Sequence, residues 1–534
     1  MMCHPQRAIA LIILGLGLAV TVQASNLDMI GVTLLRAATT NLNGAGIRVA
    51  QPEASDPLWE VNPTNVLVMQ SLTLFSYIGP DGITNAFPNS VGTESGHANT
   101  VAGEFYGTVY GVATNVAHVD NLEATYFYTN YVTPLSSVGD SVINQSYIFG
   151  YVTNGTPTIP GDISVSEQQS LDSQYDNYAA KFGQLLVSGI GNGGAVDPPA
   201  TCYNGIGVGA FRGSSSTGPT LDNGRCKPDL VAPEGETSYA TPEVAGAAAI
   251  LMQAAKRGDG GGDTNSAADL RVVKALLLNG AVKPGDWTNS SVTPLDARYG
   301  AGVLNVYNSY AQLAGGKRSW IFSTNVPQNT AHLPVPNSNF IPVLNGWDFN
   351  TNSSGNTSDG VEHYFFNVTN AAAGARFLAT ATLVWNRHQG KTGINNLELF
   401  LYNCANSNLV ACSTSAVDNV QHLFVPQLAP GRYDLQVWKA AGISGVTIVS
   451  GAEPYALAFA FVSPSVAISR AGGTAGVTWP FYPAGFALES STDLAPANWS
   501  TNNLPSLVLT NGQNQVQVPL VKSNQFFRLR LPNF

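Results

Sequence analysis

The sequence predicts an α/β domain built on a doubly wound, mostly parallel sheet, followed by a β-sandwich or jelly-roll domain and a small C-terminal β module. Three observations predict this order. Strand-like apolar runs alternate with helical patterns as far as residue 315. Short strands separated by turns fill residues 320–463, and the same pattern of short strands and turns continues over residues 464–534. A chain of 534 residues is also too long for a single hydrophobic core, so several domains are expected.

Residues 1–24 have the pattern of a secretory signal peptide. A short segment containing Arg7 precedes an apolar run from Ala8 to Val22, and small residues near its end suit cleavage after Ala24. The alternative is an uncleaved anchor helix, but the apolar run is short for one, and no later segment is long and apolar enough to span a bilayer. We therefore expect a secreted or periplasmic mature chain without a membrane span.

The elements of the α/β domain, expected over residues 25–315, follow from hydrophobic periodicity. The segments "GIRVAQ" at 46–51 and "QLLVSGIG" at 184–191 are typical of buried strands. The segments "SEQQSLDSQYDNYAAKFG" at 166–183 and "AADLRVVKALLLNGA" at 267–281 are typical of helices. Strands and helices that alternate along the chain favour a parallel sheet with helices on both faces.

Beyond residue 320 the pattern changes to short strands between Asn, Gly and Pro turns. Examples are "ARFLATATLVW" at 375–385 and "GRYDLQVWK" at 431–439, within the predicted sandwich of residues 320–463. Residues 464–534 also carry short strands and turns, and they are too few for more than a compact β module. Structural support of the first domain and ligand binding both remain open as roles for the sandwich.

The charge of the chain argues against two classes of partner. Only 11% of the residues are charged, the formal net charge is −10, and Lys and Arg are nowhere concentrated. Because nucleic acids and anionic membrane surfaces are bound through basic patches, neither is an expected partner.

Four cysteines remain once a signal peptide containing Cys3 is removed. An even number in an exported chain is compatible with disulfides, and the economical pairing joins Cys202 to Cys226 and Cys404 to Cys412. The alternative is buried or free thiols. Neither pair has a close Cys or His companion at zinc spacing, so no metal is expected there.

A serine opens a strong helical pattern in "TSYATPEVAGAAAILMQAAK" at 237–256. Ser238 lies near the start of this helix, where unpaired N–H groups can hold an oxyanion, and Pro242 falls near the first turn, where a missing N–H costs least. A serine at such a place is also a common N-cap, so the residue type alone does not decide between a nucleophile and a cap.

The sequence motifs on either side of Ser238 favour the nucleophile. "KPDLVAP" at 227–233 followed by "TSYATPEVAG" at 237–246 resembles the nucleophile region of the subtilisin-like serine peptidases. The resemblance implies a subtilisin-like fold for residues 25–315, polypeptide substrates, no required cofactor, and Ser238 as the nucleophile. A serine hydroxyl needs a neighbouring base at neutral pH, so a histidine and its orienting acid are expected elsewhere in the domain.

Two further segments supply these partners. "SGHANTVAGEFYG" at 95–107 is similar to the histidine motif of the family, which implies His97 as the base. Aligning "GIRVAQPEAS" with the first core strand of the family brings Glu53 to the place of its aspartate, and Asp56 is the competing candidate. The order acid, histidine, serine is the subtilisin order.

The oxyanion hole of the family contains a side-chain amide. "SGIGNGGA" at 188–195 is similar to the segment that carries it, which implies Asn192 as the donor, whereas an ordinary Asn-Gly turn is the alternative.

Three departures from the family pattern concern the active site. Glu236 stands where the family has a glycine, the segment before Thr-Ser is shortened to "EGE", and "QSYIFG" replaces a glycine-containing edge strand. The first predicts strain in the turn that aims Ser238. The third brings Ile148 and Phe149 beside the expected path of the substrate, which predicts a narrower cleft.

The sequence thus favours a secreted serine endopeptidase with a Glu53, His97 and Ser238 triad. The alternative is a weak or inactive pseudopeptidase that serves as a binding or structural module. No metal is expected, although "RGDGGGDTNS" at 257–266 has the carboxylates of a structural calcium site; an exposed loop is the favoured interpretation.

Overall fold

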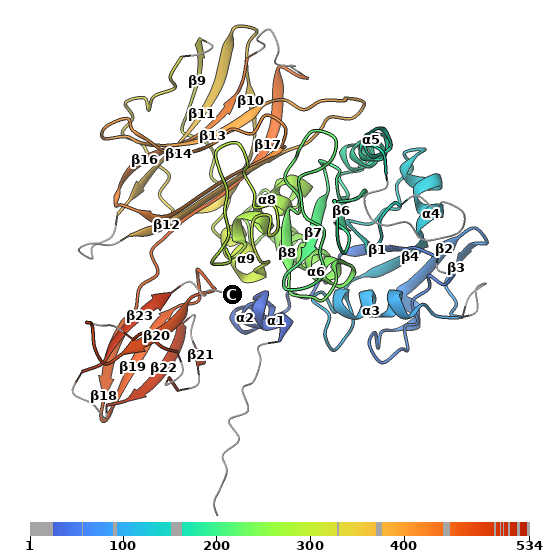
Figure 1. Cartoon of the computed structure of the whole chain (residues 1–534), viewed down its shortest axis with the longest axis horizontal. Coiled ribbons are helices and arrows are strands. Elements are labelled where there is room, and N and C mark those ends of the chain that lie inside the picture. Colours follow the sequence, from blue (N-terminus) through green and yellow to red (C-terminus); the bar gives the residue numbers. More distant parts are fainter. Residues whose placement is uncertain are drawn as a thin grey trace, which may run out of the picture.

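The computed structural model describes residues 25–534 with a few gaps. The gaps are residues 56, 89–92, 151–162, 328–329, 370–375, 442–448, 496–497, 502–503, 506, 511–512, 521–523 and 531–534. The predicted signal peptide and the competing acid Asp56 therefore lie outside the described residues. Figure 1 shows a domain of helices and sheet followed by two all-β bodies.

The first domain is organised around one eight-stranded sheet, which confirms the predicted α/β class (Figure 1). The strands, in spatial order, are β3 (Gly82–Thr84), β2 (Phe75–Gly79), β4 (His118–Glu123), β1 (Arg48–Glu53), β5 (Val142–Gln145), β6 (Leu185–Gly189), β7 (Ile206–Ala210) and β8 (Leu230–Ala232). Only β3 pairs antiparallel, with β2, and every other neighbouring pair is parallel. The carboxyl ends of β1, β5 and β6 consequently meet at one edge, where open α/β sheets bind their ligands.

Helices cover both faces of this sheet. The helices of the domain are α1 (Asn26–Met29), α2 (Val32–Ala38), η1 (Leu72–Leu74), α3 (Gly96–Phe105), α4 (Ala124–Phe127), η2 (Tyr128–Val132), α5 (Val165–Phe182), α6 (Thr237–Arg257), α7 (Thr264–Ala267), α8 (Leu270–Gly280) and α9 (Val306–Ala314). Val49 of β1 packs into the core that includes α3, α6 and α8, whereas its neighbour Ala50 packs with Tyr175 and Tyr178 of α5. This alternation is the period of a strand that is buried on both sides.

Small residues bring α6 close to its neighbours. A Cβ at Gly246 of α6 would lie 2.6 Å from Cβ of Val112, and a Cβ at Gly189 of β6 would lie 3.0 Å from Oγ1 of Thr241. Larger residues would push the helix away from the sheet and from the segment that follows α3. The small residues therefore set how closely α6 packs against the sheet. Because Ser238 lies in the first turn of α6, they also set the position of Ser238.

The second domain is a sandwich of two antiparallel sheets, as predicted. One sheet contains β10 (Asn345–Ser353), β17 (Ala452–Val462), β12 (Phe377–Trp385) and β15 (Val420–Leu428). The other contains β14 (Leu409–Ser413), β13 (Leu397–Asn403), β16 (Gly431–Lys439), β11 (Ser358–Val368) and β9 (Phe322–Pro327). Aromatic and aliphatic side chains from both sheets form its core, and β12 and β17 pack against α8.

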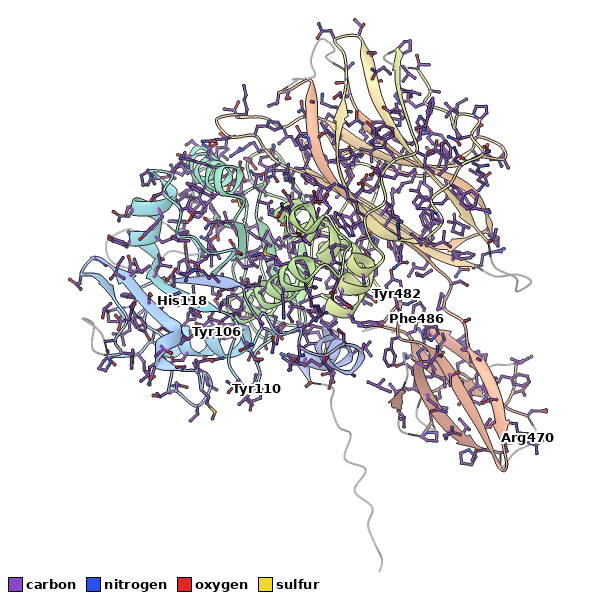
Figure 2. The ribbon with its side chains drawn as sticks, turned by 180° about the vertical axis from the view of Figure 1, so that it is seen from behind. Tyr106, Tyr110, His118, Arg470, Tyr482 and Phe486 are labelled. Carbon is purple, nitrogen blue, oxygen red and sulfur yellow. The ribbon has the colours of Figure 1, made fainter. Side chains whose placement is uncertain are left out.

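The C-terminal module is also all-β, as predicted. Its strands are β18 (Ala467–Ala471), β19 (Thr474–Pro480), β20 (Ala487–Ser491), β21 (Val508–Thr510), β22 (Gln513–Pro519) and β23 (Phe526–Arg530). Its core is small, with Val477, Trp479 and Val516 among the buried residues. Figure 2 shows Tyr482 and Phe486 at the end of the module near α9, where the Ala484 N–H donates to Oδ1 of Asn308 at 2.7 Å.

The predicted disulfides are absent, because all four cysteines are free. Cys202 packs in the core beneath α5, whereas Cys226 packs in the core on the other face of the sheet. Cys412 lies opposite Phe400 in the β13–β14 hairpin. Phe400 comes four residues before Cys404, so Cys412 and Cys404 are separated by about 13 Å along the strand. A disulfide needs Cα atoms within about 7 Å, so the economical pairing was wrong.

Two other features bear on the sequence predictions. Among the described residues, no helix is long and apolar enough to cross a membrane. In the 257–266 loop, Asp259 pairs with Arg257, and Asp263 pairs with Lys317 at 2.8 Å and caps α7. The two carboxylates that suggested calcium are thus held by cations of the chain itself.

Candidate active site

Glu53, the last residue of β1, contacts His97. Its Oε2 lies 2.8 Å from Nδ1 of His97, and the carboxylate is almost completely buried. A carboxylate at this distance fixes the ring orientation and holds the proton on Nδ1, so that Nε2 is left free to accept a proton. The longer glutamate side chain therefore spans the gap between strand and histidine.

The second oxygen of Glu53 is held by its own strand. Gln51, two residues earlier and on the same face of β1, donates from Nε2 to Oε1 of Glu53 at 2.8 Å and to the carbonyl of Ala98 at 3.0 Å. The hydroxyl of Tyr106 in turn donates to Oε1 of Gln51. The carboxylate thus has partners on both oxygens, and one of them also ties β1 to the helix that carries His97.

His97 lies in the first turn of α3. The helix begins after Ser95, whose Oγ accepts from the Ala98 N–H at 3.2 Å, and 40% of the His97 side chain remains exposed. Burial by itself lowers the pKa of His97, but the hydrogen bond and charge of Glu53 and the charge of Glu236 outweigh it and raise the pKa above 6.5. These carboxylates therefore favour the imidazolium form of His97.

Ser238 is the second residue of α6 and does not cap the helix. The cap position belongs to Glu236, whose side chain makes no capping hydrogen bond, and Thr237 is the first helical residue. Oγ of Ser238 donates to the carbonyl of Ser146 at 3.4 Å, and Oγ of Ser146 donates back to the carbonyl of Ser238 at 2.7 Å. The Ser238 hydroxyl thus lies at the carboxyl end of β5, outside the hydrogen bonding of the helix.

The predicted strain at Glu236 is absent. Its backbone is extended, with φ −142° and ψ 155°, a conformation that any residue adopts. A glutamate therefore replaces the family's glycine at this position without conformational cost, and that expectation was wrong.

Asn192 follows β6 and faces the start of α6. Its Oδ1 accepts from the backbone N–H of Thr237 at 2.9 Å and from Oγ1 of Thr237 at 2.8 Å. With the carbonyl oxygen held in this way, the NH₂ group of the exposed side chain is left as a donor toward solvent. Asn192 is thus anchored to Thr237, the residue before Ser238. From this position its NH₂ group is suited to donate a hydrogen bond to an oxyanion.

His97 and Ser238 belong to the same site but are not hydrogen-bonded. The ring of His97 lies 5.8 Å, centroid to centroid, from the ring of Tyr239, the residue after Ser238. In the part of the chain that the structure describes, no hydrogen bond joins Ser238 to His97, and the hydroxyl is directed at Ser146 instead. Catalytic hydrogen bonds of this kind are often long without substrate and tighten when substrate binds.

The comparison with protein families concerns the same domain. The model of the subtilase family matches residues 84–302. The resemblance of the α/β domain to the subtilase family is thereby confirmed. His97, Asn192 and Ser238 lie within the matched residues, whereas Glu53 precedes them. The match supports a serine peptidase, with polypeptides as its class of substrate.

Three solved structures, two of peptidases by their names and one of a macrocyclase, are similar to parts of this chain. The prenylagaramide maturation protease PagA shares 19% identity, covering 54% of this chain and 99% of its own, with a TM-score of 0.35. The PatG macrocyclase in complex with peptide shares 17% identity, covering 56% of this chain and 100% of its own, with a TM-score of 0.35. Tripeptidyl peptidase 2 shares 15% identity over 74% of this chain and 43% of its own, with a TM-score of 0.30. The likeness to the subtilase family rests on the family model and not on these structures.

The aromatic segment after β5 packs inward in the α/β domain. The ring of Phe149 lies 5.3 Å from that of Tyr128 and 6.1 Å from that of Tyr175, and its backbone N–H donates to the carbonyl of Pro198 at 2.8 Å. Phe149 therefore joins the core beneath α5, while Ile148 remains half-buried. The predicted narrowing of the cleft stays a prediction, since residues 151–162 lie outside the described residues.

Sequence reasoning missed the residues that hold the site together. Glu53 is held by Gln51, which is held in turn by Tyr106. Ser238 is held by Ser146, and Asn192 by Thr237. No motif in the sequence drew attention to these supporting side chains. One signal was available for Gln51. A polar residue two positions before Glu53 in a buried strand lies on the same face, where it needs a polar partner.

Proposed function

We propose that this protein is an exported serine endopeptidase that hydrolyses polypeptides with Glu53, His97 and Ser238 as its catalytic triad. The observation that carries the proposal is the 2.8 Å contact between buried Glu53 and Nδ1 of His97, at the edge of the sheet where the first turn of α6 carries Ser238. The subtilase family match supports the serine peptidase chemistry. The signal-peptide pattern of residues 1–24 supports export.

The chemistry follows from the donors and acceptors of the site. Nε2 of His97 accepts the proton of Ser238 as Oγ bonds to the substrate carbonyl carbon. The negative charge that develops on the carbonyl oxygen is held by the Ser238 N–H and the NH₂ group of Asn192. His97 then gives the proton to the leaving amine, and a water molecule releases the acyl group by the same steps in reverse order.

The orienting carboxylate has a defined task in these steps. The Glu53 carboxylate stabilises the imidazolium that forms on His97, and Gln51 keeps this carboxylate in place. The reaction needs no metal or organic cofactor, because the serine supplies the nucleophile and the amide and backbone donors supply the charge stabilisation.

The proposal is tested with mature protein recovered from the medium or periplasm of an expressing bacterial host. N-terminal sequencing is expected to begin at Ser25, and mass spectrometry of a casein digest is expected to show internal fragments that a Ser238→Ala preparation does not produce. Products trimmed only from the substrate termini would refute the endopeptidase assignment. A digest that is identical with the Ser238→Ala protein would favour the pseudopeptidase alternative.

A further inference from the structure

Three glutamates from three segments meet beside the catalytic helices. Glu104 lies in α3, seven residues after His97; Glu234 lies in the loop before α6; and Glu243 lies in α6, five residues after Ser238. One carboxylate oxygen of each lies within 4.8 Å of one from each of the others. Among the described residues, no other group of three Asp, Glu, His or Cys side chains has its ligand atoms this close together.

Glu243 is the unusual member of this glutamate cluster. Its side chain is completely buried, and neither carboxylate oxygen has a hydrogen-bond partner. An isolated ionised carboxylate inside a protein carries a large desolvation cost unless a cation or a set of donors offsets it. The nearby amide of Asn26 donates to Oε1 of Glu234, and its approach to Glu243 lowers the pKa of Glu243 less than burial raises it. The structure thus presents a buried ligand group aimed at two further carboxylates without a counter-charge.

The electrostatics of the glutamate cluster point the same way. Burial and the charge of Glu234 raise the pKa of Glu104 to about 7, and burial followed by the charges of Glu234 and Glu104 raises that of Glu243 well above its usual range. Such a group either keeps protons or binds a cation that replaces them. Glu104 and Glu234 are half-buried, so an ion from solvent reaches the cluster without unfolding the core.

We propose that Glu104, Glu234 and Glu243 bind one divalent cation, and that Ca²⁺ is the preferred ion. The ligands are carboxylate oxygens, which suit a hard cation, whereas Zn²⁺ in structural sites is usually held by Cys and His. The amide of Asn26 adds a possible oxygen, because a half-turn of the amide plane directs Oδ1 toward the cluster.

The bound ion would connect three parts of the domain. Asn26 belongs to α1 and is the second residue after the predicted cleavage site, Glu104 belongs to the helix of His97, and Glu243 to the helix of Ser238. Figure 1 shows α1 beside the α6 end of the domain. We infer that the cation fastens the mature N-terminus to the two catalytic helices, a role that goes beyond peptide-bond hydrolysis.

The test uses the full mature protein, first freed of metal with EDTA. Isothermal titration with Ca²⁺ is expected to give one site, and the melting temperature is expected to rise with Ca²⁺. The isosteric variant Glu243→Gln is expected to fold in EDTA about as stably as the parent, since it is neutral and of the same size as a protonated glutamate, and to lose both responses. Asp263→Asn, in the 257–266 loop, is the matched control and is expected to keep both responses.

Several outcomes would overturn this site. One is the absence of Ca²⁺ binding to the parent protein, and another is unchanged binding to Glu243→Gln. Loss of binding in Asp263→Asn would place the ion in the loop instead. If Glu243→Gln does not fold, the half-buried Glu104→Gln takes its place, and unchanged binding there contradicts the proposal equally. None of these measurements depends on Ser238, so the result is independent of peptidase activity.

Discussion

Two helices on opposite faces of the same sheet, α5 and α6, start next to serines that do different things. Oγ of Ser164 accepts from the Glu167 N–H, and the Ser164 N–H donates to the Glu167 carboxylate, so this serine completes a capping box. Ser238 lies inside the first turn of α6, whose N-cap residue Glu236 makes no capping hydrogen bond, and its hydroxyl is directed at Ser146. Asn192 accepts from the Thr237 N–H, and a helix start without a cap from its own N-cap residue keeps its other N–H groups for a ligand.

The comparison also separates structural from chemical roles of acidic residues. Glu167 is exposed and fastens a helix end, whereas Glu53 is buried and contacts a histidine. Serine and glutamate therefore stabilise one helix end within a single segment at α5. At α6 the same two residue types come together from separate segments of the chain. Variants at the two places should have opposite consequences for stability and activity.

The largest expected effect is that of Ser238→Ala. Removing a triad serine should lower turnover by a factor of about 10⁶, because no other group supplies the nucleophile. The melting temperature should stay near that of the parent, since Ser238 caps nothing. Steady-state hydrolysis and thermal melting are the two measurements, and a large loss of stability without a loss of turnover would make Ser238 a structural residue.

The next effect is that of Glu53→Gln. The substitution keeps the size of the side chain but withdraws the charge that stabilises the His97 imidazolium, so turnover should fall by about 10⁴. Asp56→Asn is the matched control and should turn over normally. Steady-state kinetics on both, with folding checked by thermal melting, decide the matter, and the reverse pattern would show that Asp56 is the acid.

Asn192→Ala should reduce turnover by about 10² to 10³, the usual effect of removing one oxyanion donor. Asn192→Asp is the sharper variant, because its carboxylate still accepts from Thr237 but no longer donates. A parallel loss in both, mainly in kcat and with little change in KM, is expected. Full activity of Asn192→Asp would remove Asn192 from the site.

Ser164→Ala should leave hydrolysis unchanged and cost about 1 kcal/mol of unfolding free energy, the usual effect of losing a serine N-cap. Urea denaturation monitored by circular dichroism measures this loss. An effect on kcat as large as that of Asn192→Ala would break the contrast between the two helix starts.

The smallest effect concerns pH. Because neutral His97 is the working base, kcat/KM should rise with pH through the pKa of His97, which Glu53 and Glu236 hold above 6.5. Glu236→Gln removes one negative charge, so the imidazolium is less favoured and the acid limb should move to lower pH. A pH–rate profile of this variant beside Asp259→Asn measures the shift, and an acid limb that moves to higher pH would contradict the assigned base.

Much of the fold was predictable because it depends on periodicity within short segments. The alternation that buries Val49 and Ala50 on opposite faces is present in "GIRVAQ", and the motifs around His97 and Ser238 are continuous in the sequence. The disulfide prediction failed because spacing along the chain does not say which face of a sheet a residue such as Cys202 joins.

The site was predictable only in part, for a related physical reason. Glu53 could be aligned with a strand end, but the contacts of Gln51 with Ala98 and of Asn192 with Thr237 join segments that are far apart in the sequence. The glutamate cluster that contains Glu243 is of the same kind. Each member is unremarkable within its own segment, and only the packing of α3 on α6 brings them together.

The most direct test of Ser238 as a nucleophile is active-site labelling of the mature protein with a fluorophosphonate, followed by peptide mapping. We expect one adduct, on Ser238, that is strongly reduced in Glu53→Gln and in His97→Ala but retained in Ser164→Ala. A folded protein that takes up no label at Ser238, or that is labelled equally when His97 is replaced, would contradict it.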